Sequence, residues 1–106
     1  MQERFVTMLG FAQRAGKVSS GESAAQAMLQ KKRGFLVILA QDASERTRNS
    51  YINRCAEAGI PCIVTGSQIS LGEIIGRSPR SVIVVTDKHF AKVLLEVLEI
   101  KQSLKF

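Results

Sequence analysis

The sequence predicts an α/β fold, namely a three-layer α/β/α sandwich around a mixed, largely parallel sheet of about four strands. Continuous apolar runs at residues 35–40, 62–65 and 81–86 are typical of strands that are covered on both faces. Segments with apolar residues at helical spacing precede and follow these runs, so strands and helices alternate along the chain. With 106 residues, 45% of them hydrophobic and 23% charged, the chain can bury one core, and we expect a single domain over residues 1–106.

The first part of the chain contains two predicted helices separated by a short strand. Four apolar residues at helical spacing predict the first helix: Phe5, Met8, Leu9 and Ala12. Gly16 is expected to end this helix, and Val18 is expected in a very short strand. The second helix is expected from about Gly21 to Lys32, with Gly34 as its stop signal.

Three further helices are predicted, one after each apolar run. Asp42, with Glu45 three residues later, is expected to begin the first of them, and Gly59 is expected to end it. The expected buried face of that helix consists of Tyr51, Ile52, Cys55 and Ala56. A short helix around Leu71 follows the second run, and Asp87 is expected to cap the last helix.

The charge of the chain indicates a polyanionic partner. Fifteen Lys and Arg residues against nine Asp and Glu residues give a net charge of +6 and a pI near 9.8. The first 54 residues hold nine basic and four acidic residues, or +5, so the excess lies in this half. The sequence has no apolar run of membrane-spanning length and no leader-like start. We therefore expect a cytoplasmic protein without a membrane partner.

The sequence lacks the usual signatures of an enzyme. His89 is the single histidine and is expected at the surface, where it has no acid–base partner. Cys55 and Cys62 lie seven residues apart without further ligands, so we expect reduced thiols rather than a disulfide framework or a zinc site. Glycine-rich phosphate loops and nucleophile motifs are absent. We therefore expect no catalytic residue, no cofactor and no metal.

Residues 15–25 form the stretch where we expect a ligand. Two glycines, three serines and Lys17 stand at the start of the second predicted helix, and a helix N-terminus with free N–H groups attracts phosphate. A structural interpretation is also open. Ser19 and Glu22 have the spacing of a capping box, in which each side chain satisfies the backbone N–H of the other.

Several short motifs together resemble a known family. They are found at residues 9–18, 20–22, 36–44, 59–61, 71–76 and 82–91. In this order they resemble the YlxQ-like bacterial branch of the ribosomal-protein superfamily of kink-turn RNA binders, whose archaeal and eukaryotic members include large-subunit ribosomal proteins. The resemblance covers about residues 3–98. It implies an α/β/α sandwich without a cofactor, which recognises sharply bent RNA through a Gly-led helix start and the loop before the last strand.

The resemblance assigns roles to individual residues and also shows where this chain departs from the family pattern. Gly21 takes the position where the backbone approaches RNA, and Glu22, Ser23 and Ala24 take the positions of the polar readers. Ala24 has no hydrogen-bonding side chain, so this segment is better suited to anchoring an RNA backbone than to reading bases. The loop at residues 77–80 is basic here, whereas it is apolar in kink-turn binders, and basic side chains suit phosphates.

We therefore predict a small RNA-binding protein whose partner is structured RNA, such as a kink-turn or ribosomal RNA. The residues expected to contact RNA are Lys17, Ser20, Gly21, Glu22, Ser23, Lys31, Lys32, Arg33, Gln41, Arg46, Arg77, Ser78 and Arg80. Two alternatives remain open. One is a protein-interaction module on the ribosome or in a transcription complex. The other is a small-molecule or phosphate-binding enzyme subunit that uses Lys17, Ser20 and Ser23 at the helix start.

Overall fold

Helices and strands alternate along most of the chain in the computed structural model, which describes residues 1–103, and side chains as far as residue 98. The elements in this range are α1 (Glu3–Arg14), β1 (Val18–Ser20), α2 (Glu22–Gln30), β2 (Leu36–Leu39), α3 (Glu45–Ala58), β3 (Cys62–Val64), α4 (Gln68–Ile74), β4 (Val82–Val85) and α5 (Lys88–Ser103). Each predicted strand is present. The observed strands are shorter than the apolar runs by one or two residues.

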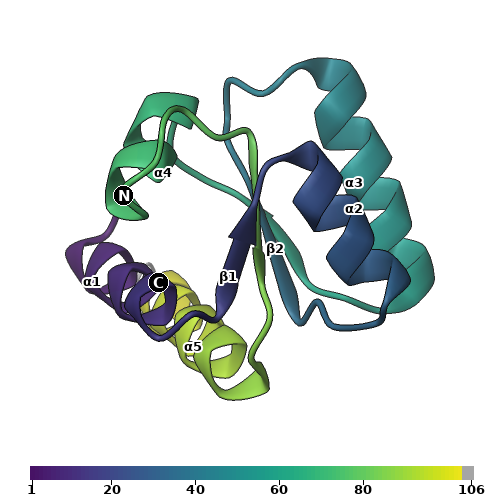
Figure 1. Ribbon diagram of the computed structural model, residues 1–106. Coiled ribbons are helices and arrows are strands. Elements are labelled where there is room, and N and C mark those ends of the chain that lie inside the picture. The colour runs from purple at the N-terminus through teal and green to yellow at the C-terminus, as the bar shows by residue number, and fades with distance from the viewer. Residues whose placement is uncertain (104–106) are drawn as a thin grey trace.

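The sheet lies between two layers of helices, so the predicted sandwich is confirmed (Figure 1). Successive residues of a strand point to opposite faces, and in β2 all four residues are buried. Leu36 and Ile38 join the core under α1, α4 and α5, whereas Val37 and Leu39 join the core under α2 and α3. A strand that is covered on both faces needs apolar residues at every position, which explains the continuous run in the sequence.

The sheet is mixed as predicted, but the prediction of a largely parallel sheet is wrong. The strand order is β1-β4-β2-β3, and within residues 1–103 the one parallel pair is β2 with β3. Strand β4 is antiparallel to both of its neighbours. The cause lies in α4, which has seven residues and spans about 10 Å, against about 21 Å for the fourteen residues of α3. Because α4 does not carry the chain back across the sheet, β4 begins at the edge where β3 ends.

Two expectations about α3 are corrected by side-chain contacts. Ser44 is its N-cap, and the Ser44 Oγ accepts a 3.1 Å hydrogen bond from the N–H of Thr47. Asp42 instead accepts a 2.8 Å hydrogen bond from the N–H of Gln68, the first residue of α4. The buried face of α3 is also narrower than expected, because Ile52 is 43% exposed and Ala56 is exposed as well. The prediction for Asp87 is confirmed, since its Oδ2 accepts a 2.9 Å hydrogen bond from the N–H of Phe90.

The two cysteines are free thiols that lie against each other. Cys55 is buried and Cys62 half-buried, and a hydrogen bond between the thiols lowers the pKa of Cys55 and raises that of Cys62. Among the residues that the structure describes, no cluster of three or more His, Cys, Asp or Glu side chains could hold a metal ion. Within the same residues, every helix is too short or too polar to span a membrane.

Candidate nucleic-acid interface

One edge of the sheet collects loops from four parts of the chain. Strands β1, β2 and β3 run in one direction and β4 in the other, so the ends of the first three strands meet the start of β4. This edge is at the top of Figure 1. We call it the loop edge and define it by residues 20–24, 40–46, 65–68 and 75–81. In mixed α/β sheets, ligands bind at such an edge more often than on a helix-covered face.

Gly21 begins α2 in a conformation that suits glycine. Its φ of 90° and ψ of 156° lie in a region that side-chain-bearing residues rarely adopt. The Gly21 N–H donates a 3.1 Å hydrogen bond to the carbonyl of Val82, which fixes this turn beside β4. In the described part of the chain, no side chain caps α2. The N–H groups of Glu22 and Ser23 therefore lack intrahelical partners at an exposed, positively polarised helix end.

The capping box expected from Ser19 and Glu22 is not formed. Ser19 lies in the middle of β1, paired with Val84, so its side chain does not cap α2. Ser19 lies inside the strand, and Ser20 and Gly21 separate it from Glu22, the first residue of α2. The N-cap position of α2 is therefore occupied by Gly21, which has no side chain to accept a hydrogen bond from the helix N–H groups.

Glu22 is held by side chains of α3. The Thr47 hydroxyl donates a 3.1 Å hydrogen bond to Glu22 Oε1, and the Tyr51 hydroxyl donates a 3.1 Å hydrogen bond to the Glu22 carbonyl. Burial raises the pKa of Tyr51, and the negative charge of Glu22 raises this pKa further. Thr47 and Tyr51 follow Glu22 by 25 and 29 residues, so no local pattern in the sequence could have revealed these contacts.

Gln68 connects three segments of the loop edge. Its Nε2 donates a 3.0 Å hydrogen bond to the carbonyl of Asp42, in addition to the N–H contact with the Asp42 carboxylate. Its Oε1 accepts a 3.0 Å hydrogen bond from the Ser81 hydroxyl, and its carbonyl accepts one from the Arg80 N–H. Sequence reasoning missed Gln68, which belongs to no motif. Its contacts fix the spacing of the loops after β2 and before β4.

Arg80 attaches the basic loop at residues 75–81 to β1. Its Nε donates a 3.0 Å hydrogen bond to the Ser20 hydroxyl, and its Nη1 donates a 2.7 Å hydrogen bond to the Ser78 hydroxyl. The other side of the loop packs on α4 at Gly72, where a Cβ atom would come within 2.4 Å of the Ser78 carbonyl oxygen. Arg77 is exposed on this rigid loop. Arg80 therefore positions the loop, and Arg77 presents a charge to solvent.

The structure brings nine of the thirteen predicted contact residues together at the loop edge. They are Ser20, Gly21, Glu22, Ser23, Gln41, Arg46, Arg77, Ser78 and Arg80. Gln41 and Arg46 are both exposed, in the loop after β2 and in the first turn of α3. The N–H of Gln41 donates a 2.8 Å hydrogen bond to the carbonyl of Gly66, which links the ends of β2 and β3.

The other four predicted residues lie at the opposite end of the strands. The carbonyl of Lys17 accepts a 2.8 Å hydrogen bond from the N–H of Thr86, beyond the Val18–Val85 pair. Lys31, Lys32 and Arg33 follow the last turn of α2. We call this side the opposite edge and define it by residues 15–17, 31–35, 59–61 and 86–88. The stretch at residues 15–25 is therefore divided between the two edges by β1.

Comparison with known proteins identifies the family. Residues 4–95 match the model of the ribosomal protein L7Ae/L30e/S12e/Gadd45 family. The chain belongs to this family. Within the L7Ae family it is a YlxQ-like member, because it is similar to two bacterial proteins of that name. RNA-binding protein YlxQ of Bacillus subtilis (strain 168) is 37% identical over 92 residues, which cover 87% of this chain and 92% of that protein. RNA-binding protein YlxQ of Enterococcus faecium is 31% identical over 98 residues, which cover 92% of this chain and 94% of that protein.

Solved structures share the same L7Ae-like architecture. A protein of unknown function from Bacillus halodurans C superposes with a TM-score of 0.88 and 32% identity, covering 92% of this chain and 99% of that one. The 15.5kD RNA binding protein of Giardia lamblia superposes with a TM-score of 0.79, covering 98% of this chain and 92% of that one. At 20% identity, this likeness shows a common fold alone. The confirmed predictions are therefore the family and the sandwich with a four-stranded mixed sheet.

Proposed function

We propose that this protein binds structured RNA through the loop edge and acts as a binding protein rather than an enzyme. The observation that carries the proposal is the uncapped start of α2, which Arg80 joins to the basic loop through Ser20. The names of the two YlxQ relatives support an RNA partner. We further propose that the chain acts as one domain, in the cytoplasm, without a cofactor.

The start of α2 supplies the backbone contact in this proposal. The N–H groups of Glu22 and Ser23 donate to a phosphate group at the positive end of the helix. A Cβ atom at Gly21 would meet no atom within 4 Å, so the turn is open to an approaching RNA backbone. The hydrogen bond from Thr47 draws the Glu22 carboxylate toward α3, which reduces its repulsion of a phosphate group.

Exposed basic side chains supply the remaining charge. Arg46 lies in the first turn of α3 and Arg77 in the loop before β4, so the two arginines belong to different elements of the loop edge. Guanidinium groups match phosphate geometry through paired N–H donors. Arg80 contributes indirectly, because its hydrogen bonds fix the loop that carries Arg77. Ser78 and Ser20 serve the same role, because their hydroxyls accept hydrogen bonds from Arg80.

The proposed recognition depends on RNA shape more than on base identity. Ser23 and Ala24 occupy the positions where the resembled family has polar side chains that read bases. Ser23 has one hydroxyl there, and Ala24 has no hydrogen-bonding side chain. Phosphate contacts position a protein on a nucleic acid, while base contacts specify the sequence. A sharply bent RNA such as a kink-turn, which exposes closely spaced phosphates, is the ligand class that fits this edge, and ribosomal RNA contains structured elements of that general kind.

A titration with matched RNAs tests the proposal. A kink-turn RNA and a straight duplex of equal length and composition are titrated with the protein between about 50 and 200 mM salt. We expect tighter binding of the bent RNA, and we expect Arg46→Gln/Arg77→Gln to lower its affinity roughly tenfold and the salt slope by roughly 0.7–0.9 per lost phosphate contact. Arg54→Gln, an exposed change on α3 away from the loop edge, is the control.

Each outcome has a defined meaning. Equal affinity for the two RNAs would overturn the preference for bent RNA and keep RNA binding. Failure to bind either RNA, together with salt-sensitive capture of an acidic ribosomal or transcription protein after nuclease treatment, would overturn the RNA proposal in favour of a protein partner.

A further inference from the structure

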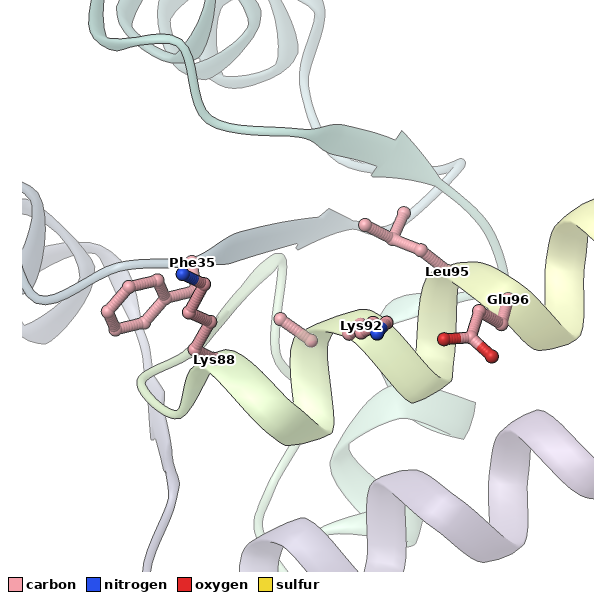
Figure 2. A pocket seen from close by; sticks show the side chains of 6 residues that line it. Phe35, Lys88, Lys92, Leu95 and Glu96 are labelled. Atoms are coloured by element: carbon pink, nitrogen blue, oxygen red, sulfur yellow. The ribbon is translucent and has the colours of Figure 1, made fainter.

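A groove lies between the start of β2 and one side of α5, away from the loop edge. Its volume is about 430 Å³, and its lining residues are Phe35, Lys88, Ala91, Lys92, Leu95 and Glu96. Figure 2 shows Phe35 and Lys88 together at one end, with Lys92, Leu95 and Glu96 along the helix. Phe35 is 37% exposed although its neighbour Leu36 is fully buried. We call this feature the Phe35 groove.

Basic residues surround the Phe35 groove at the opposite edge. Phe35 donates its N–H to the carbonyl of Val85, and the next residue, Thr86, donates its N–H to the carbonyl of Lys17. Since β4 lies between β1 and β2, the backbones of Lys17 and Phe35 are about 10 Å apart. The exposed basic residues of this region are Lys17, Lys31, Lys32, Arg33, Lys88 and Lys92.

Few acidic groups offset this charge. Asp87 caps α5 through its carboxylate, Glu96 stands at the end of the Phe35 groove, and Glu57 shares a second groove with Lys32. Among the side chains that the structure describes, the opposite edge and the lining of the Phe35 groove together hold six basic and two acidic side chains, and Glu57 lies just outside them. A surface of this kind attracts a polyanion.

The basic segment before the Phe35 groove is held in a fixed conformation. Lys32 has a φ of 59°, in the left-handed region where helices commonly end on glycine, and here the chain places a lysine. The N–H of Arg33 donates a 2.9 Å hydrogen bond to the carbonyl of Met28. Gly34 is buried, and a Cβ atom there would come within 3.1 Å of Val84 Cγ1. These contacts fix the backbone that carries the basic side chains, which reduces the backbone entropy lost on binding.

We infer that the opposite edge is a second RNA site, which takes an unpaired, single-stranded segment. An exposed aromatic ring bordered by ammonium groups suits a nucleobase that stacks on the ring while its flanking phosphates contact lysines. A peptide whose side chains are all acidic would satisfy the charges but would leave the apolar groove without a matching group. The inference rests on the proposed function, because it assigns a second segment of RNA to the same protein.

The two sites lie at opposite ends of the strands. Helix α3 begins at the loop edge and ends at the opposite edge, and its fourteen residues span about 21 Å. The molecule measures 35 × 29 × 26 Å. A short oligonucleotide at the Phe35 groove therefore leaves the loop edge accessible, and both RNAs are expected on one protein at the same time.

Photocrosslinking and titration with a single-stranded probe test the inference. The probe is an oligouridylate of about four nucleotides, which is too short to cover both sites and carries one 5-iodouridine. We expect its main crosslink at Phe35, and we expect Phe35→Leu and Lys31→Gln/Arg33→Gln each to lower its affinity roughly five- to tenfold. Phe35→Tyr, which retains a stacking ring, is expected to restore binding. The exposed change Arg4→Gln on α1 is the charge control.

The test separates the second site from the loop edge. Arg46→Gln/Arg77→Gln is expected to leave oligouridylate binding unchanged, while Lys31→Gln/Arg33→Gln leaves binding of the bent RNA unchanged. If Arg46→Gln/Arg77→Gln abolished oligouridylate binding and Lys31→Gln/Arg33→Gln did not, the second site would be overturned. RNA binding through the loop edge would remain valid. Binding of an acidic peptide, but not of the oligouridylate, at the opposite edge would overturn it in favour of a protein partner.

Discussion

The Nε of Arg80 donates a 3.0 Å hydrogen bond to the hydroxyl of Ser20, which joins two residues that are 60 positions apart in the chain. Ser20 ends β1 directly before Gly21, and Arg80 lies near the end of the basic loop, two residues before β4 begins at Val82. The bond therefore fixes the distance between the start of α2 and the exposed Arg77. A rigid arrangement of these two parts is what the proposed RNA contact requires.

Arg80 and Arg77 are expected to respond differently to substitution. Arg80→Gln removes the bonds to Ser20 and Ser78, so we expect a loss of about 1–2 kcal/mol of folding stability together with weaker RNA binding. Arg77→Gln is expected to weaken RNA binding several-fold with an unchanged free energy of unfolding, because its side chain is exposed. Urea unfolding and RNA titration of both variants measure this. An equal loss of stability in the two variants would contradict the division of roles.

Gly21→Ala is expected to destabilise the protein by about 1–3 kcal/mol, because alanine is strained at a φ of 90°. A Cβ atom at this position meets no neighbour within 4 Å, so the loss comes from the backbone and not from a clash. Gly10→Ala is the matched control. Gly10 lies inside α1 with equally open space, and we expect that change to stabilise the protein by about 0.5–1 kcal/mol. Urea unfolding measures both, and a stabilised Gly21→Ala variant would refute the argument.

Lys32→Gly is expected to stabilise the fold while weakening single-stranded RNA binding. Glycine adopts the observed φ of 59° without strain, so we expect a gain of about 0.5–1 kcal/mol in the free energy of unfolding. The lost ammonium group is expected to lower oligouridylate affinity a few-fold. Lys31→Gly serves as the control, because Lys31 has a right-handed helical conformation and offers no such gain. Thermal unfolding and the titration give the two readouts. Unchanged stability of Lys32→Gly would show that lysine is not strained there.

Tyr51 is expected to titrate above its ordinary pKa of 10.0 in the folded protein. Burial, followed by the charge of Glu22, favours the neutral phenol, so the folded state binds this proton more tightly than the unfolded state. The stability that Tyr51 contributes is therefore complete below pH 10 and falls as the pH rises above it. Because the chain has one tyrosine, the ultraviolet absorbance of tyrosinate reports this residue directly. A titration midpoint in native protein equal to that in urea would contradict the expectation.

The elements of this fold follow closely from local sequence patterns. The run at residues 35–40 predicted β2 because a strand covered on both faces has no polar position. Asp87 was correctly predicted to cap α5, because a cap depends on residues three positions away. The same local argument failed for Asp42, whose carboxylate accepts from Gln68 of another helix, 26 residues along the chain. Local spacing carries no information about such a distant partner.

The sequence by itself determined the strands, the order of helices, the basic charge and the family motifs, because each of these depends on residues that are close along the chain. The tertiary structure decided which of those residues share a surface. The short α4 makes β4 antiparallel, which brings the basic loop to Ser20 and Gly21. The same topology places Lys17 and Lys31–Arg33 at the other end of the strands. The residues that were expected to form one RNA surface therefore lie at two edges of the sheet, because strand direction is set by long-range pairing and not by the local pattern.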